Sequence, residues 1–309
     1  MATVPTEITR GVVAAKLHGE KSDISGAAFR FLLIACLGVV LASLAALIAS
    51  VSGGGIDVLS TRGIGDFIQR PFSINADFTG VYQGIVGTVT CALIVVVVAF
   101  PLGVAAALFL EEYASDNPFT RIVDLVIRNL AGVPAVVYGL LGYAMFVGGG
   151  LSGLTGGSSV LSAGLTLSIL VLPIVVITSA EAIRAVPSAL REGGFGAGAN
   201  RWEVVRTLIL PNAFPGILTG TILALARALG EAAPLILVGA KTSGFSGGDW
   251  GDLTGSFTAL PNMINNWATR PPKSWDGNTQ AAILVTLVVV LGINAVGIIL
   301  RNRFDKARR

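Results

Sequence analysis

The chain has 309 residues, of which 53% are hydrophobic and only 13% charged. An average soluble domain carries about 25% charged residues, so this composition excludes an ordinary water-soluble protein and indicates one that lies in a bilayer. The formal net charge of +3 is typical of basic residues held beside anionic lipid at a cytoplasmic surface. It does not point to a nucleic-acid partner.

Long uncharged runs predict the membrane crossings, because a helix that rises about 1.5 Å per residue needs roughly 20 residues to cross about 30 Å of hydrocarbon. Residues 31–51 form the first run, which is longer than the apolar part of a signal peptide and predicts an uncleaved start. Residues 78–110 are expected to form one crossing from about Gly84, kinked at Pro101. Residues 280–300 form the last run.

Two further stretches complete the count. Residues 129–180 carry no charge, and the glycine-rich segment 148–159 lies near their middle, so we expect two crossings joined by a turn. Residues 212–238 are apolar enough to cross despite two charges. The sequence therefore predicts an all-α membrane protein with six transmembrane helices. Its parts are an N-terminal tail (1–30), a transmembrane domain (31–300) and a C-terminal tail (301–309).

Basic residues predict the orientation, because Lys and Arg are retained on the cytoplasmic side. With the N-terminus inside, the inner segments hold 15 Lys and Arg and the outer loops hold 5. We therefore expect both termini and the loop 181–211 in the cytoplasm, and the loop 241–278 outside.

Groups that carry metal, disulfide or nucleotide chemistry are scarce. Cys36 and Cys91 lie in predicted helices, where each is expected to be a small buried hydrophobe. The one histidine, His18, lies in the N-terminal tail, so neither a disulfide framework nor a metal site is predicted. No G-x-x-x-x-G-K-[ST] motif occurs, so we expect no ATP hydrolysis and no covalent chemistry by this chain.

The loop 181–211 predicts two short helices. Pro187 suits the start of the first, SALREGGFGAG. Asn200 with Glu203 predicts a capping box at the start of the second, which we expect to end before Pro211. The glycines of the first helix weaken it by on the order of 1 kcal/mol each, which fits either a flexible loop or a backbone that approaches a partner's groove closely. These glycines are Gly193, Gly194, Gly196 and Gly198.

Arg227 and Glu231 stand four residues apart in an apolar stretch. On a helix they share one face with small residues, which lets helices approach closely and turns the charges away from lipid. Pro234 leaves the carbonyl of Gly230 without a helical partner and predicts a kink beside the pair, where a gate could bend. The small residues are Gly216, Gly220 and Ala224.

Two interpretations of this pair stay open. In one, Arg227 and Glu231 satisfy each other and pin the helix packing. In the other, Arg227 offers its planar donors to a tetrahedral oxyanion in a translocation pathway. Glu231 then compensates the arginine when no anion is bound, so that binding stays weak and reversible.

The loop also resembles the EAA loop of ABC-importer permeases, E-A-A-x-x-x-G-x(9)-I-x-L-P. Glycines replace both alanines and a leucine replaces the isoleucine, changes that keep size and polarity. In that family the loop forms a coupling helix that sits in a cleft of the ATPase subunit, and the resemblance implies the same role here. The matched positions are Glu192, Gly193, Gly194, Gly198, Leu208 and Pro211.

Two other segments, NLAGVPAVVYGLLG (129–142) and GILTGTILALARALGEAAPL (216–235), resemble the membrane subunits of the phosphate-specific ABC importer, PstA type in particular. Family members often have threonine where this chain has Ala232, which puts one hydrogen-bonding group in doubt. The resemblance implies a type I importer fold in a bacterial inner membrane and import of inorganic phosphate. The implied partners are a PstC-type permease, a PstB-type ATPase dimer that binds the ATP, and a PstS-type phosphate-binding protein outside.

Three tryptophans lie in the outer loop 241–278: Trp250, Trp267 and Trp275. Such residues often anchor a protein at the membrane edge. The alternative, which rests on the resemblance, is contact with the phosphate-loaded binding protein.

Two rival functions stay open. The chain fits a permease for another oxyanion such as sulfate or molybdate in every respect except the phosphate-family segments. A secondary transporter in which Glu231 carries a proton is the other rival, although an ion-driven carrier has no need of a docking loop.

Overall fold

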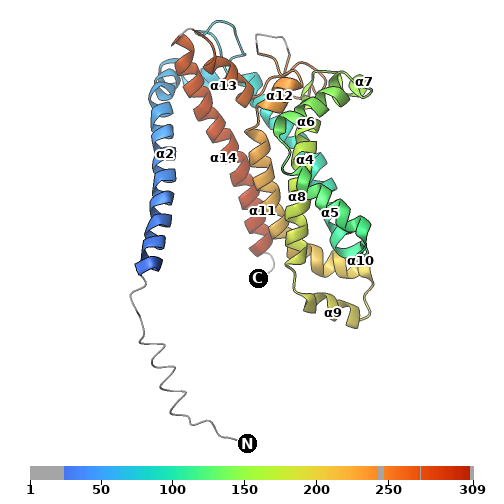
Figure 1. The fold of residues 1–309 in the computed structure, drawn as a ribbon. Helices are drawn as coiled ribbons and strands as arrows, with labels where there is room; N and C mark the ends of the chain where they lie inside the picture. Colours follow the sequence, from blue (N-terminus) through green and yellow to red (C-terminus); the bar gives the residue numbers. More distant parts are fainter. Residues whose placement is uncertain (1–23, 243–246, 272, 307–309) are drawn as a thin grey trace, which may run out of the picture. The chain divides into compact units, whose positions relative to one another are not determined.

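A computed structural model describes residues 24–242, 247–271 and 273–306, and within these ranges every regular element is a helix (Figure 1). The chain divides into two compact units, Met1–Val51 and Ser52–Arg309. Most of the predicted N-terminal tail, including His18, and the last three residues lie outside the described ranges.

The described part of the first unit is the beginning of helix α2 (Ile24–Arg62). Its apolar side chains are exposed, with Phe31 at 74% and Val39 at 66%. A helix that is hydrophobic on all sides suits a lipid environment. The prediction that Cys36 is buried is wrong because this stretch exposes its side chains all round, whereas Cys91 is buried in the second unit.

The second unit contains four further long apolar helices. Together with α2, five helices of the described chain are long and apolar enough to cross a membrane. These four are α4 (Tyr82–Leu108), α8 (Val160–Arg184), α11 (Leu210–Leu229) and α14 (Asp276–Lys306).

A bent pair of helices supplies the sixth crossing. Helix α5 (Pro118–Leu130) meets α6 (Ala135–Gly142) at an angle of 101°, and α6 continues as the π-helical turn η2 (Tyr143–Val147). Counted as one span, the pair brings the number of crossings to six. The predicted all-α protein with six transmembrane helices is confirmed.

The course of this sixth span differs from the predicted crossing that starts at Asn129. Helix α5 already ends at Leu130, because the residue before a proline is pushed out of the α region and Pro134 follows closely. The Tyr138 hydroxyl donates to the Leu130 carbonyl at 2.8 Å. The same carbonyl also accepts from the Val133 amide at 3.0 Å, so two donors meet at the C-terminal end of α5, where the helix itself supplies none.

Helix α8 lies at the centre of the second unit, with α4 and α11 packed against it. Its side chains Val171 and Val175 are fully buried. Helix α11 approaches it closely at two glycines: Gly220 faces Thr178, and a Cβ built on Gly216 would lie 2.8 Å from the Ala182 Cβ.

The entry to α11 corrects another prediction. The capping box of Asn200 and Glu203 is confirmed and opens α10 (Arg201–Val204). This helix does not end before Pro211 but continues through the π-helical turn η3 (Val205–Ile209) into α11. Pro211 stands in the first turn of α11, and the wider π turn before it accommodates a ring that a regular α-helix interior would reject.

The exit from α11 differs as well. We expected one crossing over residues 212–238, but α11 ends at Leu229 and the short helix α12 (Ala233–Leu237) follows after a break. Pro234 stands in the first turn of α12, a position that suits proline because no helical amide bond is lost there. The predicted kink is therefore a full interruption of the helix.

Helix α13 lies at one end of the second unit (Figure 1). This end has its own apolar core. Trp267 is fully buried, stacks on Phe72 at 5.9 Å and touches Trp275 at 5.5 Å between ring centroids. Their burial contradicts both predicted roles, the anchor at the membrane edge and the contact with a binding protein, whereas Trp250 is 56% exposed. Short helices at this end include α3 (Ile64–Gln69), α7 (Ser152–Thr155), α13 (Leu260–Ala268) and η4 (Lys273–Trp275).

The close approach of α11 and α8 predicts opposite effects for the same substitution at two helical glycines. Gly220→Ala should lower the thermal unfolding midpoint of the chain in detergent, because the added methyl group would overlap the Thr178 side chain. Gly292→Ala in α14 should leave it unchanged or raise it, because nothing lies within 4 Å of a Cβ there and alanine favours a helix by about 1 kcal/mol. Equal effects would contradict this packing.

Candidate functional site

Arg227 and Glu231 lie where α11 ends. Arg227 belongs to the last turn of α11, and Glu231 follows in the break before α12. The Arg227 Nε and Glu231 Oε1 atoms are 3.8 Å apart, and the side chains are 53% and 26% exposed. This separation exceeds a hydrogen bond, so the carboxylate balances the charge of the guanidinium while leaving its donors available.

The two segments that resemble phosphate importers meet in space beside this pair. Helix α6, from residues 129–142, packs against α12, from residues 216–235. A Cβ on Gly139 would lie 2.7 Å from the Pro234 Cα, so only glycine lets α6 come this close. The broken α11–α12 segment is thus covered by half of the broken α5–α6 span. Paired interruptions of this kind occur where membrane helices line a binding site.

The face of α11 that Arg227 shares with the small residues is only partly covered in this unit, and Gly216 on this face is exposed. Gly220 and Ala224 are buried, the latter in the main core cluster. Leu223 and Arg227 are exposed and point out of the second unit. Arg227 therefore borders the packed face and reaches the surface that this unit presents to its surroundings.

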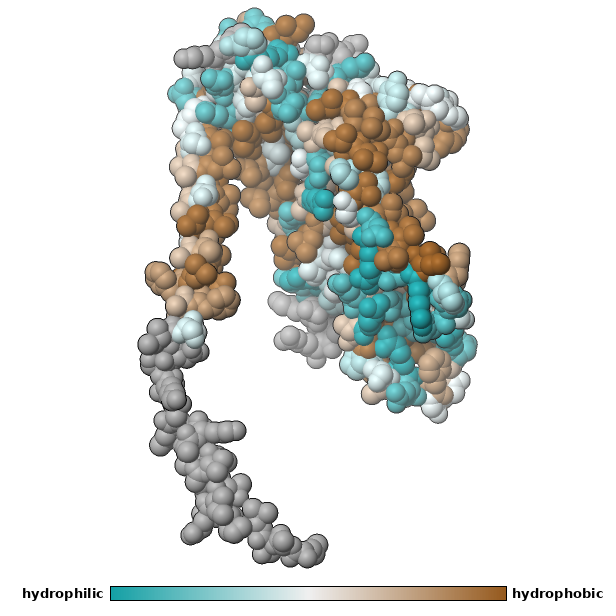
Figure 2. All heavy atoms as spheres, in the orientation of Figure 1, coloured by the Kyte–Doolittle hydropathy of each residue, from teal (hydrophilic) through white to brown (hydrophobic). Residues whose placement is uncertain are grey.

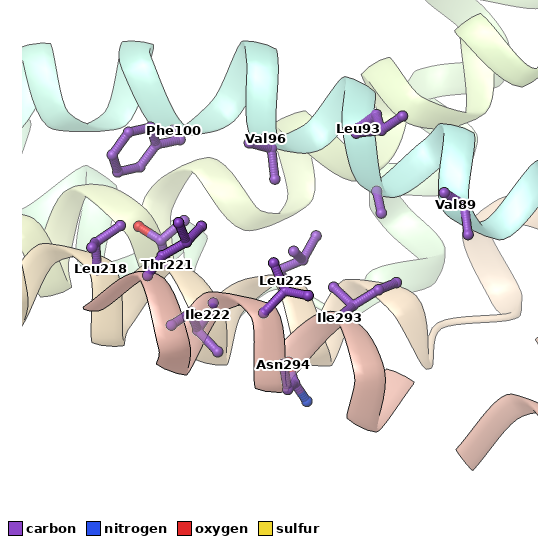
Figure 3. Close-up of a pocket in the computed structure, with 14 residues that line it drawn as sticks. Val89, Leu93, Val96, Phe100, Leu218, Thr221, Ile222, Leu225, Ile293 and Asn294 are labelled. Atoms are coloured by element: carbon purple, nitrogen blue, oxygen red, sulfur yellow. The ribbon is translucent and has the colours of Figure 1, made fainter. Parts of the chain in front are cut away.

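A groove lies between α4, α11 and α14 (Figure 3). This groove has a volume of about 410 Å³, and no charged residue lines it. Its few polar side chains include Thr221 and Asn294. An apolar groove of this kind suits a hydrocarbon chain or an apolar helix and offers nothing that would hold a phosphate.

The predicted short helix in the loop 181–211 is α9 (Ser188–Gly196), preceded by Pro187. Gly198 adopts φ = 86° just beyond its end, the Gly198 amide donates to the Phe195 carbonyl at 3.0 Å, and the Ala199 amide donates to the Gly194 carbonyl at 3.1 Å. This pair of bonds is a Schellman motif, which favours glycine at the left-handed position. Gly198 thus ends the helix.

The other positions that match the EAA loop are partly buried against the rest of the loop and partly exposed. Gly194 is buried, and a Cβ there would lie 2.9 Å from the Val204 and Leu208 side chains. Glu192 and Gly193 are exposed, and nothing lies within 4 Å of a Cβ on Gly193. Pro211 lies further along, in the first turn of α11. The exposed side of α9 is free to meet another protein.

The sequence analysis did not predict three side-chain contacts between this loop and the end of α4. Arg184, Arg191 and Arg201 each bind a side chain of the π-helical turn η1 (Phe109–Tyr113), which continues α4. The signal that could have found them is two adjacent glutamates, Glu111 and Glu112, directly after a long apolar run. Two carboxylates at the end of a crossing require partners close by.

Within the described ranges, no group of three or more His, Cys, Asp or Glu side chains could hold a metal ion. His18 lies outside those ranges. The expected absence of a metal site therefore stays a prediction.

A bundle of apolar helices with two interrupted segments and a surface loop is the architecture of a membrane-spanning transport subunit. Residues 99–309 match the family described as binding-protein-dependent transport system inner membrane component. The chain belongs to this family and is therefore a multi-pass inner-membrane protein, a permease subunit of an ABC importer.

Relatives and solved structures agree with this assignment. The chain is 32% identical over 276 residues to the probable ABC transporter permease protein YqgI of Bacillus subtilis, covering 89% of this chain and 90% of that protein. It is 34% identical over 219 residues to the phosphate transport system permease protein PstA of Mycobacterium leprae, covering 71% and 69%. A bacterial alginate ABC transporter in complex with its loaded periplasmic protein has the same fold, with a TM-score of 0.61 at 16% identity over 87% of this chain and 94% of that one.

The geometry at the end of α9 predicts opposite effects for two glycine-to-alanine substitutions. Gly198→Ala should speed amide hydrogen exchange across residues 188–199, because a left-handed conformation costs a non-glycine residue about 1–2 kcal/mol. Gly193→Ala should slow exchange, because this exposed helical position gains about 1 kcal/mol of helix propensity. Faster exchange in both variants would show that the glycines serve flexibility rather than a helix end.

Proposed function

We propose that this chain is a PstA-type permease subunit that imports inorganic phosphate into a bacterial cell. Several close relatives are named as phosphate transport permeases. The observation that carries the proposal is the half-exposed guanidinium of Arg227 at a helix break, held near a carboxylate without being hydrogen-bonded to it.

Arg227 binds the passing anion through its planar donor fork, which matches two phosphate oxygens at once. Glu231 lowers the net attraction, so the anion is released rather than trapped. The site is completed outside this unit, because the exposed side of α11 that carries Arg227 is uncovered in the second unit. A PstC-type permease supplies the facing wall of the pathway.

Transport follows alternating access. A PstS-type binding protein delivers phosphate from the outside at the end where α13 lies. At the opposite end, polar surface gathers over α5, α9 and α10 (Figure 2), which supports a cytoplasmic location for this end. ATP binding closes the PstB-type ATPase dimer there, the docked loops move with it, and rigid-body rocking exposes the path to the other face. This chain itself performs no covalent chemistry and binds no cofactor.

The pathway assignment is tested by Arg227→Ala in the four-component complex reconstituted in proteoliposomes. Phosphate uptake should fall about 10- to 100-fold, because hydrogen bonds to a charged group are worth about 1.5–3 kcal/mol, while the complex still assembles. Arg128→Ala is the matched control, because Arg128 also pairs with an acid four residues away, Asp124, at 2.9 Å with comparable exposure. Normal uptake by an assembled Arg227→Ala complex would leave the pair a structural role only.

The same preparation distinguishes phosphate from other oxyanions. Excess unlabelled phosphate should abolish uptake of labelled phosphate, whereas sulfate and molybdate should compete weakly. The reverse order would make the chain a permease for another oxyanion with the same fold and docking loop. Uptake that follows a proton gradient in the absence of the ATPase would support the secondary-transporter alternative.

The docking role of α9 rests on its exposed apolar side chains, because Leu190, Phe195 and the nearby Trp202 are 37%, 50% and 56% exposed. Phe195→Glu should reduce co-purification of the ATPase subunit by about tenfold or more, since buried aromatic residues dominate interface energies. Phe119→Glu is the control, because Phe119 is 74% exposed at the start of α5. Equal loss in both variants would indicate general destabilisation instead of docking.

A further inference from the structure

The π-helical turn η1 joins the transmembrane helix α4 to the loop that contains α9. Its last three residues, Glu111, Glu112 and Tyr113, are consecutive in the sequence. Each of them holds an arginine from a different consecutive element, at the end of α8, in α9 and at the start of α10. We call this set of three contacts the arginine clasp.

The contact of Glu112 with Arg191 is the most enclosed of the three. The Arg191 Nη2 and Nε atoms donate to the Glu112 Oε1 at 2.8 and 3.1 Å, and the two side chains are only 23% and 10% exposed. Arg191 also donates to the carbonyls of Val186 and Ile183, at 2.7 and 2.9 Å. One guanidinium therefore ties α9 both to α4 and to the end of α8.

The two flanking contacts fix the loop on either side of this point. The Arg184 Nε donates to the Glu111 Oε2 at 3.2 Å. The Arg201 guanidinium lies over the Tyr113 ring, 5.4 Å from its centroid, where a cation is attracted to the aromatic face. The three arginines stand before, within and after helix α9. The loop therefore cannot shift as a body without moving η1.

The path from η1 into the membrane is direct. Helix α4 runs into η1 without a break, as one span over Tyr82–Tyr113, so a displacement of η1 is a displacement of the end of α4. A π-helical turn is a place where a helix changes its pitch, and such turns are frequent at functional sites. A flexible loop has no need of three such contacts, so the arginine clasp indicates that this loop is held in a fixed position on η1.

We propose that the arginine clasp is the mechanical link through which movement of α9 reaches α4, with Glu112 and Arg191 as its central positioning residues. The inference rests on the proposed function, because it presupposes an ATPase that moves α9. It assigns the coupling within this chain to a particular ion pair and to one transmembrane helix.

The test uses the complete reconstituted complex with Glu112→Gln, Arg191→Gln and the double variant. Each should keep the ATPase bound and hydrolysing ATP, while the amount of phosphate moved per ATP falls about tenfold or more. The double variant should lose no more than the worse single variant, because residues that act as one unit are not additive. Asp116→Asn with Arg121→Gln is the matched control, since that 2.9 Å ion pair is 78% and 72% exposed in the same region.

A second measurement separates transmission from simple structural damage and needs no phosphate. ATP binding should change hydrogen exchange in residues 188–198 and in residues 100–113 of the wild-type complex, and Glu112→Gln should abolish only the second change. Tyr113→Leu, which leaves no buried charge unpaired, should weaken the second change in the same way if Glu112→Gln does not fold.

The outcomes distinguish the two proposals. If the wild-type complex shows no ATP-dependent change in residues 188–198, the docking function proposed for this chain is wrong. If that change occurs and still reaches residues 100–113 in the Glu112→Gln and Tyr113→Leu variants, the arginine clasp is not the link. Unaltered phosphate movement per ATP in the Glu112 and Arg191 variants would overturn it equally.

Discussion

Hydrocarbon offers no hydrogen-bond partner to a peptide group, and this constraint fixes most of the second unit. Crossings are helices, and an interruption is tolerated only where other parts of the protein cover it. The chain interrupts two segments and packs them against each other, with Gly139 of α6 pressed onto Pro234 of α12. At the other interruption, the Leu130 carbonyl accepts from both the Tyr138 hydroxyl and the Val133 amide. Polar backbone therefore gathers in one part of the bundle, beside the pair of Arg227 and Glu231.

Charged side chains in the bundle likewise need partners from the protein itself. The most enclosed ion pair of the described residues, Glu112 with Arg191, lies at the end of the bundle where α9 lies, and the chain satisfies it with its own elements. Arg227 is different, since its guanidinium is half exposed and only loosely paired. A charged group that the fold leaves incompletely satisfied points to a ligand or a partner subunit, whereas a fully satisfied pair makes the elements that it joins rigid.

The patterns that depend on local chemistry were predictable from the sequence. The uncharged runs gave the number and class of the crossings, and the Asn200–Glu203 spacing gave the capping box. Features that depend on tertiary contacts were not predictable from the sequence. Pro211 was expected to end a helix, but the π turn before it absorbs the strain. The positions Trp267 and Trp275 belong to a small core whose other members, such as Phe72, are distant in sequence, and the arginine clasp joins residues about seventy to ninety positions apart.

The relation between the two candidate regions follows from the length of one helix. The span Arg201–Leu229 is continuous over 29 residues, so Arg227 lies about 39 Å from Arg201 along the axis at about 1.5 Å per residue. Arg201 belongs to the arginine clasp, and the span ends beside the charged pair, with Arg227 in its last turn and Glu231 in the break that follows. This helix packs closely on α8. At its end, the amides of Gly230 and Glu231 donate only to the carbonyls three residues back, those of Arg227 and Ala228, at 3.1 and 3.2 Å, so the interruption has fewer regular helical bonds than the helix before it.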